Sequence, residues 1–139
     1  MADYDRNARI YDRLIGNRLY NRLVWGTSPR DYADFATEAL APADGPFLDA
    51  GCGTLVFTAE PWRALAALRA QLSPGGTFFA SMLVRDRAVG GAYLRVLQRA
   101  GEVGPPRTED DLAAAARHVF GDSARVTRTG SMAWLRATG

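Results

Sequence analysis

Lysine is absent from this 139-residue sequence, and all 17 basic residues are arginine. The chain therefore has no side-chain amine for a Schiff base or for the lysine contact of a Walker-type phosphate loop. The formal net charge is only +2. Because this excess of bases is small, it does not by itself indicate nucleic-acid binding, and we expect no nucleic-acid partner.

Cysteine, histidine and long apolar runs are also scarce. Cys52 is the single cysteine and His118 the single histidine, which excludes an internal disulfide and gives no cluster with metal-ligand spacing. No apolar run approaches the roughly 18 residues of a membrane span. Residues 1–6 lack the apolar segment of a secretory signal. We expect a cytoplasmic protein with no metal and no membrane partner.

The composition that remains is that of an ordinary globular domain. Apolar residues make up 47% of the chain and charged residues 23%, which argues against disorder. The length suits one domain. We expect a single domain over 1–139, with an N-terminal helical leader or lid at 1–45 and an α/β core at 46–139.

Residue spacing predicts alternating helices and strands. Helical periodicity covers 4–25, 29–40, 61–72, the region around Tyr93 that closes near Gly101, and 108–121. Strands are expected at 47–51 and 77–84, with two more between 124 and 138 joined at Thr129–Gly130. This alternation predicts an α/β sheet that is mostly parallel and ends in a C-terminal hairpin.

A glycine-rich turn, Asp49-Ala-Gly51-Cys-Gly53-Thr, follows the first expected strand. Glycine permits positive φ and lets a ligand approach backbone amides. A tight strand-to-helix turn needs such glycines even without a ligand. The dinucleotide fingerprint would require a third glycine at position 56, which is Val56.

Three segments resemble class I S-adenosylmethionine-dependent methyltransferases of the small-molecule type. FLDAGCGT at 47–54 is similar to their motif I, and PWRALAALRAQLSPGGTFFASMLV at 61–84 to the helix, Pro-Gly-Gly turn and strand five. Tyr11, Tyr20-Asn21 and Trp25-Gly26 resemble the family's leader. The resemblance implies a reduced Rossmann-like methyltransferase fold, S-adenosylmethionine as cofactor and a small-molecule substrate.

The resemblance also implies a set of cofactor-binding residues. Backbone groups of the glycine turn would hold the methionine part, and a leader tyrosine would touch the cofactor as part of a lid. Asp49 would reach the ligand's ammonium group or only satisfy loop amides. The implied set is Asp49, Gly51, Cys52, Gly53, Tyr11 and Tyr20. No general base is identifiable, so the catalytic residues remain unassigned.

The chain departs from the family pattern between motif I and strand five. Residues 52–76 are only 25 positions, whereas three strands and four helices need about 90. The acid that binds the ribose has no counterpart, and Leu55 replaces the third glycine. Two functions follow as hypotheses: a small-molecule methyltransferase, or a non-catalytic interaction module or partner subunit that has lost cofactor binding.

Other charged and reactive residues have more than one possible role. Cys52 as a nucleophile would need an adjacent base, and we interpret it as a packing residue and His118 as an ordinary helix residue. Arg85-Asp86-Arg87 would contact substrate or form a solvated loop. The leader arginines would form a solvated face, part of a lid, or a basic surface for an anionic partner.

The shortened interval also predicts a homodimer. Without flanking strands, 47–51 becomes a sheet edge, and unpaired edges invite pairing with another chain. The alternative is that the N-terminal helices cover this edge and keep the chain monomeric.

Overall fold

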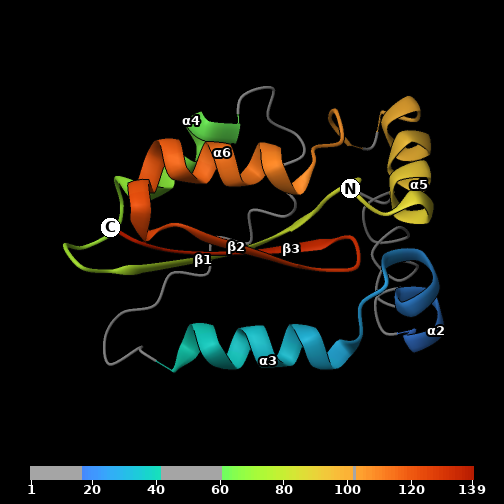
Figure 1. Ribbon diagram of the computed structural model, residues 1–139, viewed down its shortest axis with the longest axis horizontal. Helices are drawn as coiled ribbons and strands as arrows, with labels where there is room; N and C mark the ends of the chain where they lie inside the picture. Colours follow the sequence, from blue (N-terminus) through green and yellow to red (C-terminus); the bar gives the residue numbers. More distant parts are fainter. Residues whose placement is uncertain (1–16, 42–60, 102) are drawn as a thin grey trace, which may run out of the picture.

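The computed structural model describes residues 17–41, 61–101 and 103–139, which form three strands and five α-helices with short helical extensions (Figure 1). The helical elements are α2 (Arg18–Tyr20), η1 (Asn21–Trp25), α3 (Pro29–Leu40), α4 (Pro61–Arg69), α5 (Ala88–Arg99), α6 (Glu109–Phe120) and η2 (Gly121–Ser123). The strands are β1 (Thr77–Leu83), β2 (Arg125–Thr129) and β3 (Met132–Thr138). The helices expected at 29–40 and 108–121 and the C-terminal hairpin are confirmed.

The sheet has the order β1-β3-β2, with β3 antiparallel to both neighbours. Trp134 of β3 stands opposite Ser81 on one side and Thr127 on the other. The expectation of a reduced Rossmann-like fold with a mostly parallel sheet is therefore wrong for the described residues. β1 and β2 do run in the same direction, but they are not neighbours.

Burial explains why β3 takes the centre. Residues 132–135 are all buried, whereas β2 is mostly exposed and carries two arginines. A strand that is apolar on both faces belongs between two partners, and a polar strand belongs at an edge. The prediction assumed that strands separated by helices pair with each other; instead, the return strand of the hairpin occupies the position between them.

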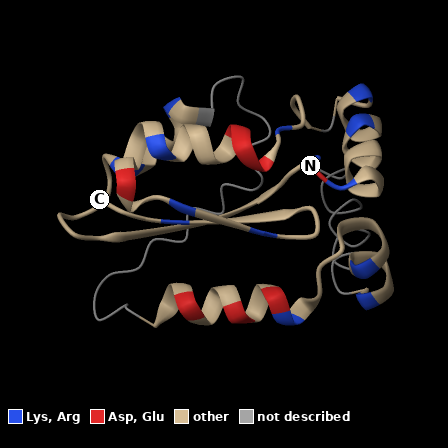
Figure 2. Ribbon diagram, viewed as in Figure 1, with Lys and Arg blue, Asp and Glu red and all other residues tan. Residues whose placement is uncertain are grey.

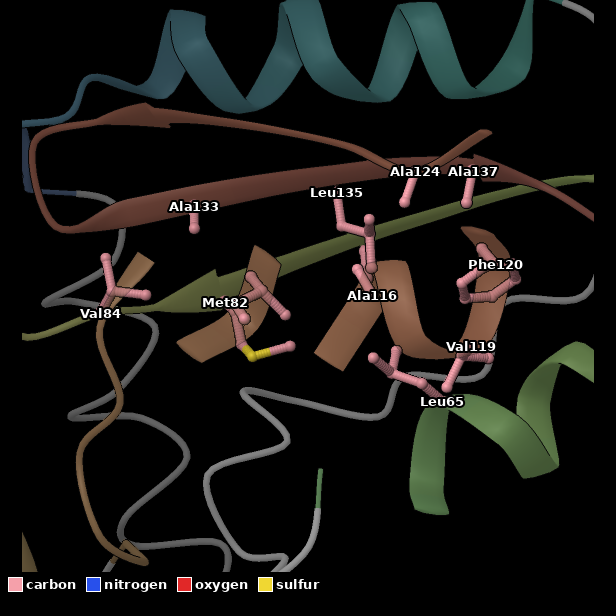
Figure 3. Packing of buried hydrophobic residues seen from close by; sticks show 12 residues of the cluster. Leu65, Met82, Val84, Ala116, Val119, Phe120, Ala124, Ala133, Leu135 and Ala137 are labelled. Carbon is pink, nitrogen blue, oxygen red and sulfur yellow. The ribbon is translucent and has the colours of Figure 1, made fainter. Parts of the chain in front are cut away.

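One face of the sheet packs against α4 and α6 (Figures 1 and 3). Alternate residues of β3 point to this side, and Leu65 of α4 and Leu112 of α6 meet them with less than 3% of their surfaces exposed. Phe120 stacks on Phe78 of β1 at 5.3 Å between ring centroids. This cluster forms the main hydrophobic core.

The other face is covered by α3 (Figure 1). Phe35 lies 4.8 Å from Trp134 and 5.7 Å from Phe79, measured between ring centroids. Tyr32 adds an edge contact to Trp134 at 5.3 Å. Since Trp134 and Leu135 are consecutive residues of a strand, they serve opposite faces of the sheet.

Helices α3 and α6 each begin with a capping box, in which a hydroxyl and a carboxylate accept hydrogen bonds from free backbone amides at the helix start. Ser28 caps α3 with Asp31 as its partner, and Pro29 occupies the first helical position as expected. Thr108 caps α6 with Asp111. The backbone N–H of Thr108, the largest influence, holds the pKa of the Asp111 carboxyl below its ordinary value.

Within the three described segments, no helix has the length and apolar character needed to cross a bilayer. The strand expected at 47–51, the edge proposed for the homodimer, lies outside the described residues. The dimer therefore stays a prediction.

Candidate functional site at the end of strand β1

The leader is joined to the end of the sheet by backbone contacts. Ser131 donates its N–H to the carbonyl oxygen of Trp25 over 2.6 Å, and Val84, just after β1, donates to the Ser131 carbonyl over 2.8 Å. The hairpin turn therefore bridges the leader and β1. This junction lies at the end of the sheet where α5 and α2 also meet (Figure 1).

Two charged residues of the loop after β1 hold neighbouring elements. Arg87 donates from Nη1 to the carbonyl oxygens of Leu23 at 3.0 Å and Arg22 at 3.3 Å, near the end of η1. Asp86 accepts from the backbone N–H of Glu109 at 2.8 Å, at the start of α6. Each charge complements the dipole of the helix end that it meets. Both side chains thus have structural partners, which neither reading of this loop predicted.

Tyr20 is the one expected cofactor residue within the described residues. Its ring lies edge-on to Trp25 at 6.3 Å and to Tyr93 of α5 at 6.4 Å between centroids. Trp25 and Tyr93 approach each other at 5.4 Å. Tyr20 is half-buried, so part of its side chain remains accessible beside an aromatic cluster that ties the leader to α5.

Two buried hydroxyls lie in this junction region. Thr27 Oγ1 and Ser131 Oγ have no hydrogen-bond partner among the described residues. A Cβ atom at Gly90 would lie 2.2 Å from Ser131 Oγ, so α5 packs here with no room for a side chain. Both hydroxyl oxygens are sealed from the surface, and they are therefore not ligand contacts in this conformation.

The remaining expected cofactor residues, Asp49, Gly51, Cys52, Gly53 and Tyr11, lie outside the described residues. The structure neither brings them together nor separates them. His118, interpreted as an ordinary helix residue, is exposed on α6 and meets the Trp62 ring edge-on at 5.7 Å. These two rings border a hollow of about 380 Å³ between α4 and α6.

A second hollow, of about 370 Å³, was not predicted from the sequence. Its lining residues are Arg18, Arg22, Ser28, Pro29 and Arg30. The leader arginines were expected to form a solvated face, part of a lid or a basic surface. Spacing alone cannot show that the chain turns at residues 26–28 and brings Arg30 beside α2 and η1. The available signal was the pair Arg18 and Arg22, four residues apart and just before a Ser-Pro helix start.

Among the described residues, no three His, Cys, Asp or Glu side chains are grouped closely enough to hold a metal ion. In comparisons with protein-family models, curated proteins and solved structures, nothing matched this chain.

Proposed function

We propose that this chain is an S-adenosylmethionine-dependent methyltransferase that acts on a small molecule, with the cofactor held beside the end of β1. The observation that carries the proposal is the position of the leader. The sequence resemblance implies a leader that covers the cofactor, and residues 25–26 contact the hairpin turn that adjoins the end of β1.

Tyr20 is the described residue that best fits a cofactor contact. It is half-buried against Trp25 and Tyr93, and an aromatic side chain with an accessible part can pack on a ligand ring. The glycine turn at 51–53 with Asp49 is assigned from the resemblance alone. When bound, the cofactor supplies an electrophilic sulfonium methyl group. The chain's own contribution is to hold the acceptor and the methyl group in line.

A second candidate is a non-catalytic interaction module that has lost cofactor binding. The hydrogen bonds of Asp86 and Arg87 favour it, because these side chains hold α6 and η1 instead of facing a substrate. The absent counterpart of the ribose-binding acid and Leu55 support it from the sequence.

Calorimetric titration with S-adenosylmethionine and with its demethylated product tests the proposal. We expect micromolar dissociation constants, which correspond to a binding free energy of about −8 kcal/mol. Gly51→Val should abolish the heat of binding, because a branched side chain would keep the ligand from approaching the backbone amides. Ala114→Val, which adds a branched side chain at an exposed position of α6, should leave it unchanged.

No heat and no thermal shift at millimolar ligand would refute the cofactor and leave the interaction module. Equal losses in the two valine variants would show that binding does not depend on the glycine turn. A cytoplasmic location belongs to the same proposal, since a lone cysteine suits a reducing compartment.

A further inference from the structure

The hollow between α2–η1 and the start of α3 concentrates positive charge. Arg18 and Arg22 lie four residues apart on the continuous helical turns of α2 and η1, so their side chains share a face. Arg30 stands in the first turn of α3 and borders the same hollow. Figure 2 shows the basic positions of α2 and of the start of α3 at one corner of the molecule.

The guanidinium groups of Arg18 and Arg22 form no hydrogen bond or ion pair with another described residue. Arg30 pairs with Asp34 at 3.6 Å, but both side chains are more than 70% exposed, and such a pair is weak. The acid in the first turn of α3 is Asp31, whose carboxylate accepts from the Ser28 N–H and hydroxyl. Within residues 17–41, 61–101 and 103–139, no acid therefore neutralises Arg18 or Arg22.

The backbone that carries these arginines is fixed on both sides. Arg87 binds the Arg22 carbonyl, and the capping box sets the start of α3. A fixed frame lowers the conformational entropy that a ligand must overcome. Arginine is suited to phosphate because its planar fork donates two parallel hydrogen bonds.

We propose that this hollow binds the phosphate group of a small phosphate monoester. A volume of about 370 Å³ is in the range of small-molecule sites and exceeds what a bare phosphate ion fills. Pro29 and the methylene stems of the arginines supply apolar lining for the organic part. None of the described lining residues is among the residues assigned to S-adenosylmethionine.

Phenyl phosphate and inorganic phosphate are the probes, titrated into the full chain in low salt and followed by calorimetry. Phenyl phosphate should bind more tightly than inorganic phosphate. The double variant R18Q/R22Q should weaken its binding by about tenfold or more, because charge-assisted hydrogen bonds are lost. All substituted residues are exposed, so far-ultraviolet circular dichroism should be unchanged.

The matched control is R95Q/R99Q, which removes two exposed arginines at the same spacing from α5. It changes the net charge equally and should weaken binding by less than about twofold. Equal losses in both double variants, or no binding of phenyl phosphate, would overturn the proposal. If the protein sediments with vesicles that contain phosphatidic acid but does not bind phenyl phosphate, the proposal is also overturned. The partner would then be a membrane surface.

Discussion

A Cβ atom at Gly130 would lie 2.1 Å from the carbonyl oxygen of Trp25, a separation that no side chain can occupy. Gly130 also has a φ of 62°, in the region where residues other than glycine are strained. The tip of the β2–β3 hairpin and the end of η1 can therefore meet only because position 130 has no side chain.

Gly130→Ala should release the leader from the sheet. We expect a loss of about 2 kcal/mol or more in the free energy of unfolding, from left-handed strain and from the displaced backbone together. Amide hydrogen exchange at Ser131, whose N–H binds Trp25, should become faster. Gly75→Ala is the control, because Gly75 has a φ of 76° but open space around its Cβ. If both variants lose the same stability, the contact with Trp25 contributes nothing.

Thr27→Val should stabilise the protein by up to about 1 kcal/mol, because it replaces a buried hydroxyl that lacks a described partner with a methyl group. Thermal unfolding measures the change. Thr37→Val is the control, since the Thr37 hydroxyl is exposed and donates to Ala33; it should give no gain. Destabilisation by Thr27→Val would show that the hydroxyl is bonded, to a buried water or to a residue outside the described segments.

The capping box of α6 should make stability depend on pH. Because the pKa of Asp111 is lower in the folded chain, its contribution to stability is complete from about one pH unit above the unfolded value of about 3.9, and it is lost as the pH falls through the folded value. The stability difference between the native chain and Asp111→Asn, from urea unfolding, should therefore shrink in acid. Asp110→Asn removes a charge from the same turn without breaking the box and should cost less at pH 7. A difference that stays constant into acid would contradict the assignment.

The homodimer prediction concerns residues 47–51 and is tested in solution. Light scattering coupled to gel filtration should give twice the 15.1 kDa chain mass if the expected edge strand pairs with a second copy. Leu48→Lys should restore the single-chain mass. A monomer over a wide concentration range would refute the dimer, and a dimer that survives Leu48→Lys must use another surface.

Local signals in the sequence predicted the elements well and their pairing poorly. Ser28-Pro29 and Thr108 with Asp111 fix helix starts through short-range chemistry, so α3 and α6 were predicted within a residue. The position of β3 depends on burial of both its faces against helices far away in the chain. That information is absent from the local alternation of helices and strands.

In the candidate sites, too, the sequence indicated individual residues but not the long-range contacts that they make. Tyr20 was named through family resemblance, but its packing on Tyr93 depends on a contact between residues 73 positions apart. Arg87 was expected to contact substrate or to lie in a solvated loop, whereas its partners are the backbone carbonyls of Arg22 and Leu23. Backbone acceptors have no residue-type signature, so such contacts are not visible in a sequence.

The central position of β3 has a consequence for synthesis on the ribosome. β1 and β2 both precede β3 along the chain, and neither pairs with the other. Among the three described strands, therefore, no hydrogen-bonded pair can form until residues 132–138 have left the exit tunnel. Until then, α4, α6 and β1 must hold their apolar surfaces exposed, which is the stage at which a nascent chain most needs a chaperone.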